Sequence, residues 1–359
     1  MASPAPRMRA AVYRGPGELR LEELPVPDVG PGELRVRVEV CGVCGTDIKK
    51  IQKGLVAPPR VFGHEIAGRV DRVGPGVTRF REGDRVALHH HIPCRACYYC
   101  SHGAYAQCGT YKRNGTTAGF EAAGGGFAEY VKAMDWIVAG GTIPVPEGVR
   151  PEEAAFVEPV NTCLKAVRKA GISPGQSVLV VGQGPIGLLL LQLARWAGAE
   201  VLASDTLPDR LELARRLGAQ AVLDSTRSDV VAEVRGMTGG RGADVTLLAA
   251  LGGAAFRQAL DATRPGGRMV PFAATSPGET VELDLGALSA SEKDVVSSYS
   301  ASVDVQDLAA QLVFRREVRV AELVSHRFPL EQAARAVDLA SRPAPGVLKV
   351  VLDLAGPSP

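Results

Sequence analysis

The chain has 359 residues, which is enough for two domains with ordinary hydrophobic cores. Hydrophobic residues make up 46% and charged residues 22%, as in soluble globular proteins. The formal net charge is +2 and there is no basic block, so nucleic acid is not an expected partner. No apolar stretch could span a bilayer and residues 1–15 lack a signal-peptide core, so we expect a cytoplasmic protein without membrane contact. Seven cysteines in such a chain favour metal binding or catalysis over disulfides.

The first 150 residues have the pattern of short strands and turns. Residues 33–40 alternate apolar and charged side chains, which predicts a half-buried strand. Further short β runs, including 85–88, fall between residues 60 and 92 and are broken by Gly and Pro. Residues 93–126 should be mostly loop, and 127–131 should resume a strand.

From residue 151 the pattern changes to alternating helices and strands. Apolar spacing predicts a helix over 151–170, and later helices over 186–197 and 210–217. Strands are predicted at 178–181, 200–204, 243–250 and 267–273. This succession predicts an α/β fold with a doubly wound parallel sheet. Beyond residue 300 the pattern weakens to a helix over 330–339 and a final strand over 347–354.

A glycine-rich turn with dinucleotide-binding spacing follows the first predicted parallel strand. Gly182, Gly184 and Gly187 fit G-x-G-x-x-G, and Pro185 opens the helix behind them. Such a helix N-terminus faces the phosphates of a dinucleotide. Asp205 ends the next strand, where a carboxylate accepts the ribose hydroxyls of NAD and repels the extra phosphate of NADP. The alternative is an ordinary strand-to-helix turn with a helix-capping Asp.

Four cysteines lie close together in the loop-rich segment. The gaps between them are two, two and seven residues, so four thiolates can close a tetrahedron round Zn²⁺ within one loop. An iron–sulfur cluster is the alternative, but its bacterial spacing has a shorter last gap and a following proline. We therefore predict a structural zinc site made of Cys94, Cys97, Cys100 and Cys108.

A second metal site is predicted from residues that are far apart in the chain. Cys44 and His64 supply a thiolate and an imidazole, and a catalytic zinc needs three protein ligands and one open position. The third ligand is either Glu65 or Glu158, and the sequence does not choose between them. Cys41 is interpreted as a small buried residue.

Three consecutive histidines, 89 to 91, also have the chemistry of metal ligands. On a strand they would alternate between two faces and could not all reach one ion. We interpret them as structural or interfacial residues near the cysteine loop.

Together these motifs resemble the zinc-containing medium-chain alcohol and polyol dehydrogenases. The resemblance covers Met8 to Leu354, and its most specific pieces are CGVCGTD, the GHE run, the four-cysteine loop and GQGPIG. It implies a GroES-like β-rich catalytic domain over 1–157, a Rossmann domain over 158–300, and a return segment over 301–359 that completes the catalytic domain. It also implies two zinc ions and NAD per chain, a small-molecule alcohol as substrate, and a homodimer or homotetramer.

The resemblance also assigns roles to individual residues. Cys44 and His64 would bind the catalytic zinc with Glu65 or Glu158, and Thr46 would hydrogen-bond the substrate hydroxyl. Asp205 and Arg210 would hold the adenosine end of NAD, and Ser298, Tyr299 and Ser300 would lie beside the nicotinamide. The cofactor site would also include Pro185, Ile186, Phe272 and Ala273.

The chain departs from the sorbitol dehydrogenase branch at several positions. Lys49 replaces a proton-relaying histidine, so it either completes the relay or has no catalytic role. Lys50 replaces an aromatic residue, Ser300 replaces an arginine, and the four-cysteine loop that this branch often lacks is intact. We expect zinc-dependent hydride transfer from a secondary alcohol (a polyol, sugar alcohol or cyclitol) to NAD, giving the ketone. The alternatives are an amino-alcohol dehydrogenase of the threonine or aminocyclitol type, and a non-catalytic zinc-stabilised NAD-binding sensor.

Overall fold

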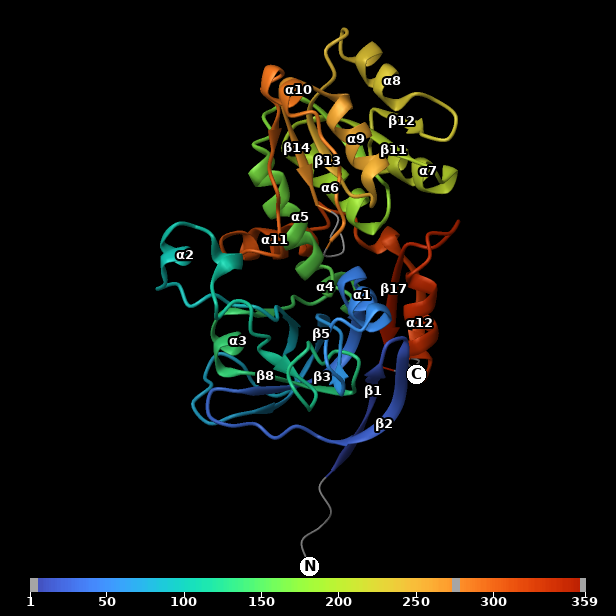
Figure 1. Cartoon of the computed structure of the whole chain (residues 1–359). Coiled ribbons are helices and arrows are strands. Elements are labelled where there is room, and N and C mark those ends of the chain that lie inside the picture. Colours follow the sequence, from blue (N-terminus) through green and yellow to red (C-terminus); the bar gives the residue numbers. More distant parts are fainter. Residues whose placement is uncertain (1–5, 273–277, 356–359) are drawn as a thin grey trace, which may run out of the picture.

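Two β-sheets of different kinds organise the chain in a computed structural model that describes residues 6–272 and 278–355 (Figure 1). One is parallel and lies between helices, and the other is largely antiparallel and curled. The predicted fold class, a Rossmann sheet with a GroES-like β-rich part, is therefore confirmed.

The parallel sheet has the strand order of a doubly wound nucleotide-binding fold. Its order is β12-β11-β10-β13-β14-β15, and every neighbouring pair is parallel. The direction of winding reverses between β10 and β13, and ligands bind at such a switch point. The strands are β10 (Ser177–Val181), β11 (Glu200–Asp205), β12 (Ala221–Asp224), β13 (Ala243–Leu248), β14 (Thr263–Pro271) and β15 (Asp294–Val295).

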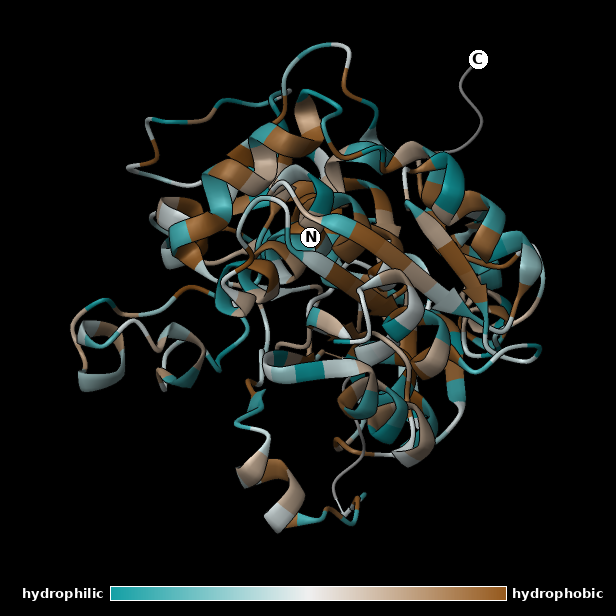
Figure 2. Ribbon diagram, turned by 90° about the horizontal axis from the view of Figure 1, so that it is seen from above, coloured by the Kyte–Doolittle hydropathy of each residue, from teal (hydrophilic) through white to brown (hydrophobic). Residues whose placement is uncertain are grey.

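Both faces of this sheet are buried, which explains the unbroken apolar run in β10. Val178 and Val180 pack into one core cluster, whereas Leu179 and Val181 pack into another. Side chains that alternate along a strand point to opposite faces, so each face has its own helical cover. Seen from above, the strands are mostly hydrophobic (Figure 2). The covering helices are α5 (Val157–Ala170), α6 (Pro185–Trp196), α7 (Pro208–Arg216), α8 (Val230–Met237) and α9 (Gly253–Ala262), and the exposed helix α10 (Leu285–Ala290) follows β14.

The curled sheet joins the two ends of the chain. Its main path is β16-β17-β3-β5-β6-β9, and β8 pairs with β3 and β7. β17 runs antiparallel to β3, with Leu352 opposite Cys41, so the last strand lies between β16 and the N-terminal strand β3 (Figure 1). The strands are β3 (Leu34–Gly42), β5 (Glu65–Val73), β6 (Arg85–Leu88), β7 (Thr116–Thr117), β8 (Tyr130–Ala133), β9 (Thr142–Pro144), β16 (Val324–Pro329) and β17 (Lys349–Asp353).

Smaller elements complete this part of the molecule. A three-stranded sheet has the order β2-β1-β4, formed by β1 (Arg7–Gly15), β2 (Glu18–Pro25) and β4 (Arg60–Val61). The cysteine loop carries α2 and projects from the side of the molecule (Figure 1). The remaining helices are α1 (Gly45–Lys53), α2 (Tyr98–Ser101), α3 (Asp135–Gly140), α4 (Pro151–Ala154), α11 (Gln306–Phe314) and α12 (Ala333–Ala340). Among the described residues, no helix is long and apolar enough to cross a membrane.

The structure differs from the predicted elements in a few places. The helix predicted over 151–170 is two helices, because Pro159 lacks an N–H and is tolerated only in the first turn of α5. The first strands β1 and β2 and the strand β16 were not predicted. The helix predicted over 330–339 begins with a 3₁₀ turn, and only residues 333–340 are α-helical.

Candidate functional site

Three of the predicted metal ligands meet where β3, α1 and β5 come together. Cys44 precedes the first residue of α1, His64 precedes β5, and Glu65 begins β5. One donor atom from each lies within 4.8 Å of the others. Gly42 pairs with Glu65 across the sheet, and a Cβ at Gly42 would come within 1.8 Å of Oε2 of Glu65. Glycine at this position therefore makes room for the carboxylate.

Asp47 is a part of the site that the sequence reasoning missed. Nδ1 of His64 lies 3.1 Å from Oδ1 of Asp47, and both side chains are buried. An ionised carboxylate only accepts hydrogen bonds, so His64 donates through Nδ1 and keeps its Nε2 lone pair for a metal. The signal was present, because Asp47 closes the CGVCGTD motif.

Lys349 is the second residue that sequence reasoning missed. It begins β17, is buried, and forms an ion pair with Glu65. Burial lowers the pKa of Lys349, but the facing carboxylate of Glu65 raises it, and the net shift is upward. Because 306 residues separate Lys349 from Val43, whose carbonyl accepts its hydrogen bond, local sequence gives no sign of this contact. The lysine supplies Glu65 with a counter-charge from the protein itself.

Glu158 approaches the same place from the start of α5. A carboxylate oxygen of Glu158 belongs to a second group of possible donors with His64 and His90, again within 4.8 Å of one another. Burial raises the pKa of Glu158 to about 7. The nearby imidazole of His64 acts in the opposite direction, but its effect is smaller. A metal cation at this position would supply the positive charge that favours the ionised carboxylate. His64 is shared by both donor groups.

The neighbouring predicted residues have different surroundings. Thr46 is exposed in the first turn of α1, and Lys49 is half-buried one turn later, with a pKa lowered by burial. Cys41 is fully buried, and its Sγ would lie 2.5 Å from a Cβ at Gly126, so it is a packing residue as predicted.

The three histidines follow β6, and each ring has different surroundings although the rings of His90 and His91 lie only 3.9 Å apart. The His90 ring lies 4.5 Å from the His64 ring, whereas His91 packs 5.1 Å from Tyr111 and places Nδ1 3.3 Å from the carbonyl oxygen of Arg113. His89 is buried, and neither of its ring nitrogens has a hydrogen-bond partner in the described chain. Only His90 of the three belongs to a group of possible metal donors, which agrees with the expectation that the three cannot all reach one ion.

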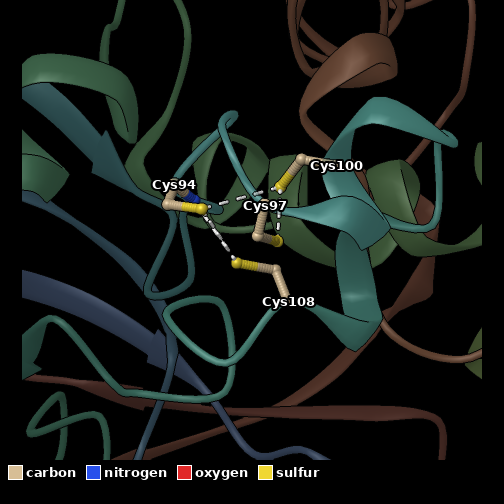
Figure 3. Close-up of side chains that lie close together, drawn as sticks. All are labelled: Cys94, Cys97, Cys100 and Cys108. Carbon is tan, nitrogen blue, oxygen red and sulfur yellow. Dashed lines mark hydrogen bonds between the residues drawn. The ribbon is translucent and has the colours of Figure 1, made fainter.

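The cysteine loop brings four sulfur atoms together (Figure 3). Sγ of Cys94 lies 4.0 Å from Sγ of Cys100 and 3.6 Å from Sγ of Cys108, and Cys97 lies 3.6 Å from Cys100. Zn–S bonds of about 2.3 Å in a tetrahedron place sulfurs about 3.8 Å apart, so the cluster fits a zinc ion. None of the cysteines is in a disulfide.

The cysteine loop is tied to the segment predicted to flank the nicotinamide. The buried hydroxyl of Tyr111 donates to the carbonyl oxygen of Ala301 at 2.8 Å and lies 3.0 Å from Oγ of Ser300. Lys165 donates to the carbonyl oxygen of Tyr299 at 2.7 Å. Oγ of Ser298 is buried without a partner among the described residues. The position of this segment therefore depends on the loop and on α5.

The glycine turn has the geometry that its spacing predicts. Gly182 has φ +90°, and a Cβ at Gly187 would lie 1.7 Å from the carbonyl oxygen of Gly182, so side chains are excluded at both positions. At Gly184 the nearest atom to such a Cβ is 3.7 Å away, on Arg210. The turn is thus tight at its first and third glycines and open at the second, where a pyrophosphate approaches. Pro185 and Ile186 begin α6.

The other predicted cofactor residues line the same end of the sheet. Asp205 ends β11, and its carboxylate accepts hydrogen bonds from the backbone N–H groups of Gln183, Thr206 and Leu207. Arg210 on α7 donates to the carbonyl oxygen of Val347. Phe272 follows β14 and donates its N–H to Leu248. Ala273 lies outside the described residues.

Helix α5 connects the metal-ligand cluster to the glycine turn. Glu158 lies in its first turn, and Sγ of Cys163 lies 4.0 Å from the carbonyl oxygen of Ile186 in the turn. The two residues are five positions apart, about 7.5 Å along a helix. The donor groups and the glycine turn therefore both contact the N-terminal half of α5.

Comparisons with known proteins agree with this arrangement. Residues 30–146 match the alcohol dehydrogenase GroES-like domain, and residues 185–315 match the zinc-binding dehydrogenase family. The sorbitol dehydrogenase of Bacillus subtilis is 30% identical, over 96% of this chain and 97% of its own. The L-threonine 3-dehydrogenase of Symbiobacterium thermophilum is 35% identical, over 95% of this chain and 96% of its own. The chain belongs to the zinc-containing medium-chain dehydrogenase family, and it is an oxidoreductase of the alcohol dehydrogenase type.

A solved structure shows the same architecture. A zinc-binding dehydrogenase of Sinorhizobium meliloti bound to NADP superposes with a TM-score of 0.87 at 31% identity. The alignment covers 97% of this chain and 99% of that one. That structure holds NADP, whereas the carboxylate of Asp205 at the end of β11 predicts NAD for this chain.

Proposed function

We propose that this protein oxidises a secondary alcohol (a polyol, sugar alcohol or cyclitol) to the ketone, with NAD as hydride acceptor. The observation that carries the proposal is the pair of donor groups that share His64, one with Cys44 and Glu65 and one with Glu158 on α5, the helix that also contacts a glycine turn of dinucleotide-binding geometry. Zinc-assisted hydride transfer needs the metal site and the nicotinamide close together, and α5 contacts both sites. The departures at Lys49, Lys50 and Ser300 leave the particular alcohol open.

The residues have separate tasks in this proposal. A zinc ion, when bound, supplies Lewis acidity toward the alcohol oxygen, and NAD supplies the hydride acceptor. Cys44, His64 and a carboxylate hold the metal, and Asp47 fixes the ring of His64. Thr46 accepts the proton of the substrate hydroxyl in a hydrogen bond and passes it outward. The participation of Lys49 in that relay stays a prediction.

Glu158 is the proposed third ligand, in preference to Glu65. Lys349 already neutralises Glu65, so this carboxylate does not require a metal as counter-charge. No cation of the chain forms an ion pair with Glu158 among the described residues, and burial raises its pKa to about 7. A carboxylate in need of positive charge gains more from binding a metal.

NAD is the proposed cofactor because of the carboxylate at the end of β11. Asp205 ends β11, and a carboxylate at this position of a Rossmann sheet accepts the ribose hydroxyls of NAD and repels the extra phosphate of NADP. The proposed cofactor-binding set is completed by the glycine turn, Arg210, Phe272, Ser298 and Tyr299. A cytoplasmic location, a homodimer or homotetramer, and domain limits at 157/158 and 300/301 belong to the same proposal.

A second candidate function is an amino-alcohol dehydrogenase. The 35% identity to an L-threonine 3-dehydrogenase favours it, and the same donor group would serve that reaction. One assay separates the possibilities: formation of reduced cofactor from NAD or NADP with a panel of polyols, secondary alcohols, cyclitols and amino alcohols. The proposal predicts turnover with polyols and NAD. Tight NAD binding without turnover on the whole panel would contradict it and favour a non-catalytic NAD-binding sensor.

A further inference from the structure

His90 is a buried imidazole beside the metal ligands that the proposed mechanism does not use. Its ring centroid lies 4.5 Å from that of His64, and the side chain is 7% exposed. A ring nitrogen of His90 lies within 4.8 Å of donor atoms on both His64 and Glu158. Ligand atoms around a tetrahedral zinc ion with bonds of about 2.0–2.3 Å lie roughly 3.3–3.8 Å apart, so the three side chains can share an ion after they close in by about 1 Å.

The hydrogen bonding of His90 is incomplete. Its Nδ1 is buried and has no hydrogen-bond partner within residues 6–272 and 278–355. Leaving a buried polar group without a partner is costly, and such a group in a native structure calls for an explanation. The adjacent His91 has a partner of its own, the carbonyl oxygen of Arg113. His90 belongs to one of the donor groups, so a cation bound there would give its ring a partner.

We propose that His90 is a fourth protein ligand of the catalytic metal when no substrate is bound, together with Cys44, His64 and Glu158. The inference rests on the proposed function for the presence of a metal at this cluster. Glu65 is left out of the set because Lys349 pairs with it. A catalytic zinc usually keeps its fourth position for water or substrate, so an alcohol must displace this imidazole before it can react.

The test uses the full chain with Co²⁺ in the catalytic site and Zn²⁺ retained in the cysteine loop. Each imidazole bound to Co²⁺ contributes one strongly shifted exchangeable proton to the NMR spectrum. The unaltered protein should show two such signals, from His64 and His90. His90→Phe, which keeps an aromatic ring of similar size, should show one. A single signal from the unaltered protein would overturn the proposal without recourse to any variant.

Metal affinity gives a second readout. In competition with a chelator, His90→Phe should bind Co²⁺ at least about 10-fold more weakly. Loss of a residue that only hydrogen-bonds a metal ligand already lowers metal affinity by about 10- to 100-fold. His89→Leu, the matched control, alters a neighbouring buried histidine outside the donor groups and should bind Co²⁺ as the unaltered protein does. Equal affinities for the unaltered protein and His90→Phe would contradict the proposal.

Failure of this inference can be told apart from failure of the proposed function. Two imidazole signals without turnover on any alcohol would support the ligand set and reject the dehydrogenase proposal. One imidazole signal with normal turnover would reject His90 as a ligand and leave the dehydrogenase proposal standing. Addition of a turned-over alcohol together with an unreactive cofactor analogue should remove the His90 signal, and its persistence would contradict displacement.

Discussion

Asp47 accepts a hydrogen bond from Nδ1 of His64 at 3.1 Å, and this contact fixes which nitrogen of the imidazole faces the metal cluster. The carboxylate also favours the N–H at Nδ1, since it has no proton to donate. The orientation of His64 is therefore set by a residue on α1 and not by the strand β5 that follows it.

Asp47→Asn should lower the affinity of the catalytic metal by about 10- to 100-fold, because the amide can turn its NH₂ toward His64 and disfavour the required tautomer. Chelator competition on the purified protein measures the effect. Asp71→Asn alters a partly exposed carboxylate that pairs with Arg35 far from the cluster, and it should leave metal affinity unchanged. Similar affinities for both variants would show that Asp47 does not position the ligand.

Lys349→Met should destabilise the metal-free protein by about 3–5 kcal/mol, because it leaves the buried charge of Glu65 without a partner. Urea denaturation followed by circular dichroism gives the change. The double variant Lys349→Met with Glu65→Gln removes both charges and should recover part of the loss. An unchanged urea midpoint for Lys349→Met would mean that the ion pair contributes nothing to folding.

Cys97→Ser should reduce the zinc content from two ions per chain to one, since three thiolates no longer close the tetrahedron. Metal analysis by mass spectrometry counts the ions. Cys163→Ala removes a buried cysteine outside both clusters and should retain two. Iron in place of zinc, with the visible absorption of a cluster, would favour the iron–sulfur alternative.

The stability of the protein should fall below pH 6.5, and His89 should account for part of the fall. Burial, and then the charges of His91 and His64, lower the pKa of His89 to about 3. Between pH 6.5 and 3 the unfolded chain binds a proton that the folded chain does not, so unfolding becomes easier as pH decreases.

His89→Leu should make the pH dependence shallower by about 1.4 kcal/mol per pH unit in this window. Urea midpoints at a series of pH values between 6.5 and 4.5 measure it. His102→Leu, at an exposed histidine, is the control and should leave the pH dependence unchanged. Parallel curves for His89→Leu and the unaltered protein would contradict the assignment.

Asp205→Ser should lower kcat/KM with NAD by about 10- to 100-fold, because a hydrogen bond to a charged group contributes about 1.5–3 kcal/mol. It should lower kcat/KM with NADP much less, because the repulsion of the extra phosphate is removed as well. Steady-state kinetics with both cofactors give the ratio. Asp209→Ser, on an exposed carboxylate that accepts from the N–H of Gly346, should leave the ratio unchanged. An unaltered preference in Asp205→Ser would place cofactor selection elsewhere.

Local sequence patterns predicted the parts of the fold that depend on local chemistry. The apolar run of 178–181 and the glycines behind it predicted a buried strand and a phosphate-binding turn, since period and turn geometry need only neighbouring residues. The four cysteines likewise lie within one loop. The prediction of one continuous helix over 151–170 was wrong, because the spacing of apolar residues takes no account of the proline in α5.

The parts that could not be predicted depend on contacts between distant segments. Lys349 meets Glu65 only because β17 pairs with β3, and nothing in the sequence near either residue marks that pairing. The alternation of side chains between the two faces of a strand does not apply to His90, because β6 ends at Leu88. The choice between Glu65 and Glu158 as the third metal ligand likewise depends on the position of Lys349, which belongs to β17.

The insertion of β17 beside β3 has a consequence for how the protein is made. At about 5–20 residues per second, a ribosome needs roughly 15 s to a minute to synthesise the 306 residues between Val43 and Lys349. During that time β3 lacks its neighbour and Glu65 lacks its cation, while the parallel sheet can already fold. The nascent chain must therefore keep an open sheet edge from aggregating until its last strand emerges, and this half of the enzyme should be the part that depends on chaperones.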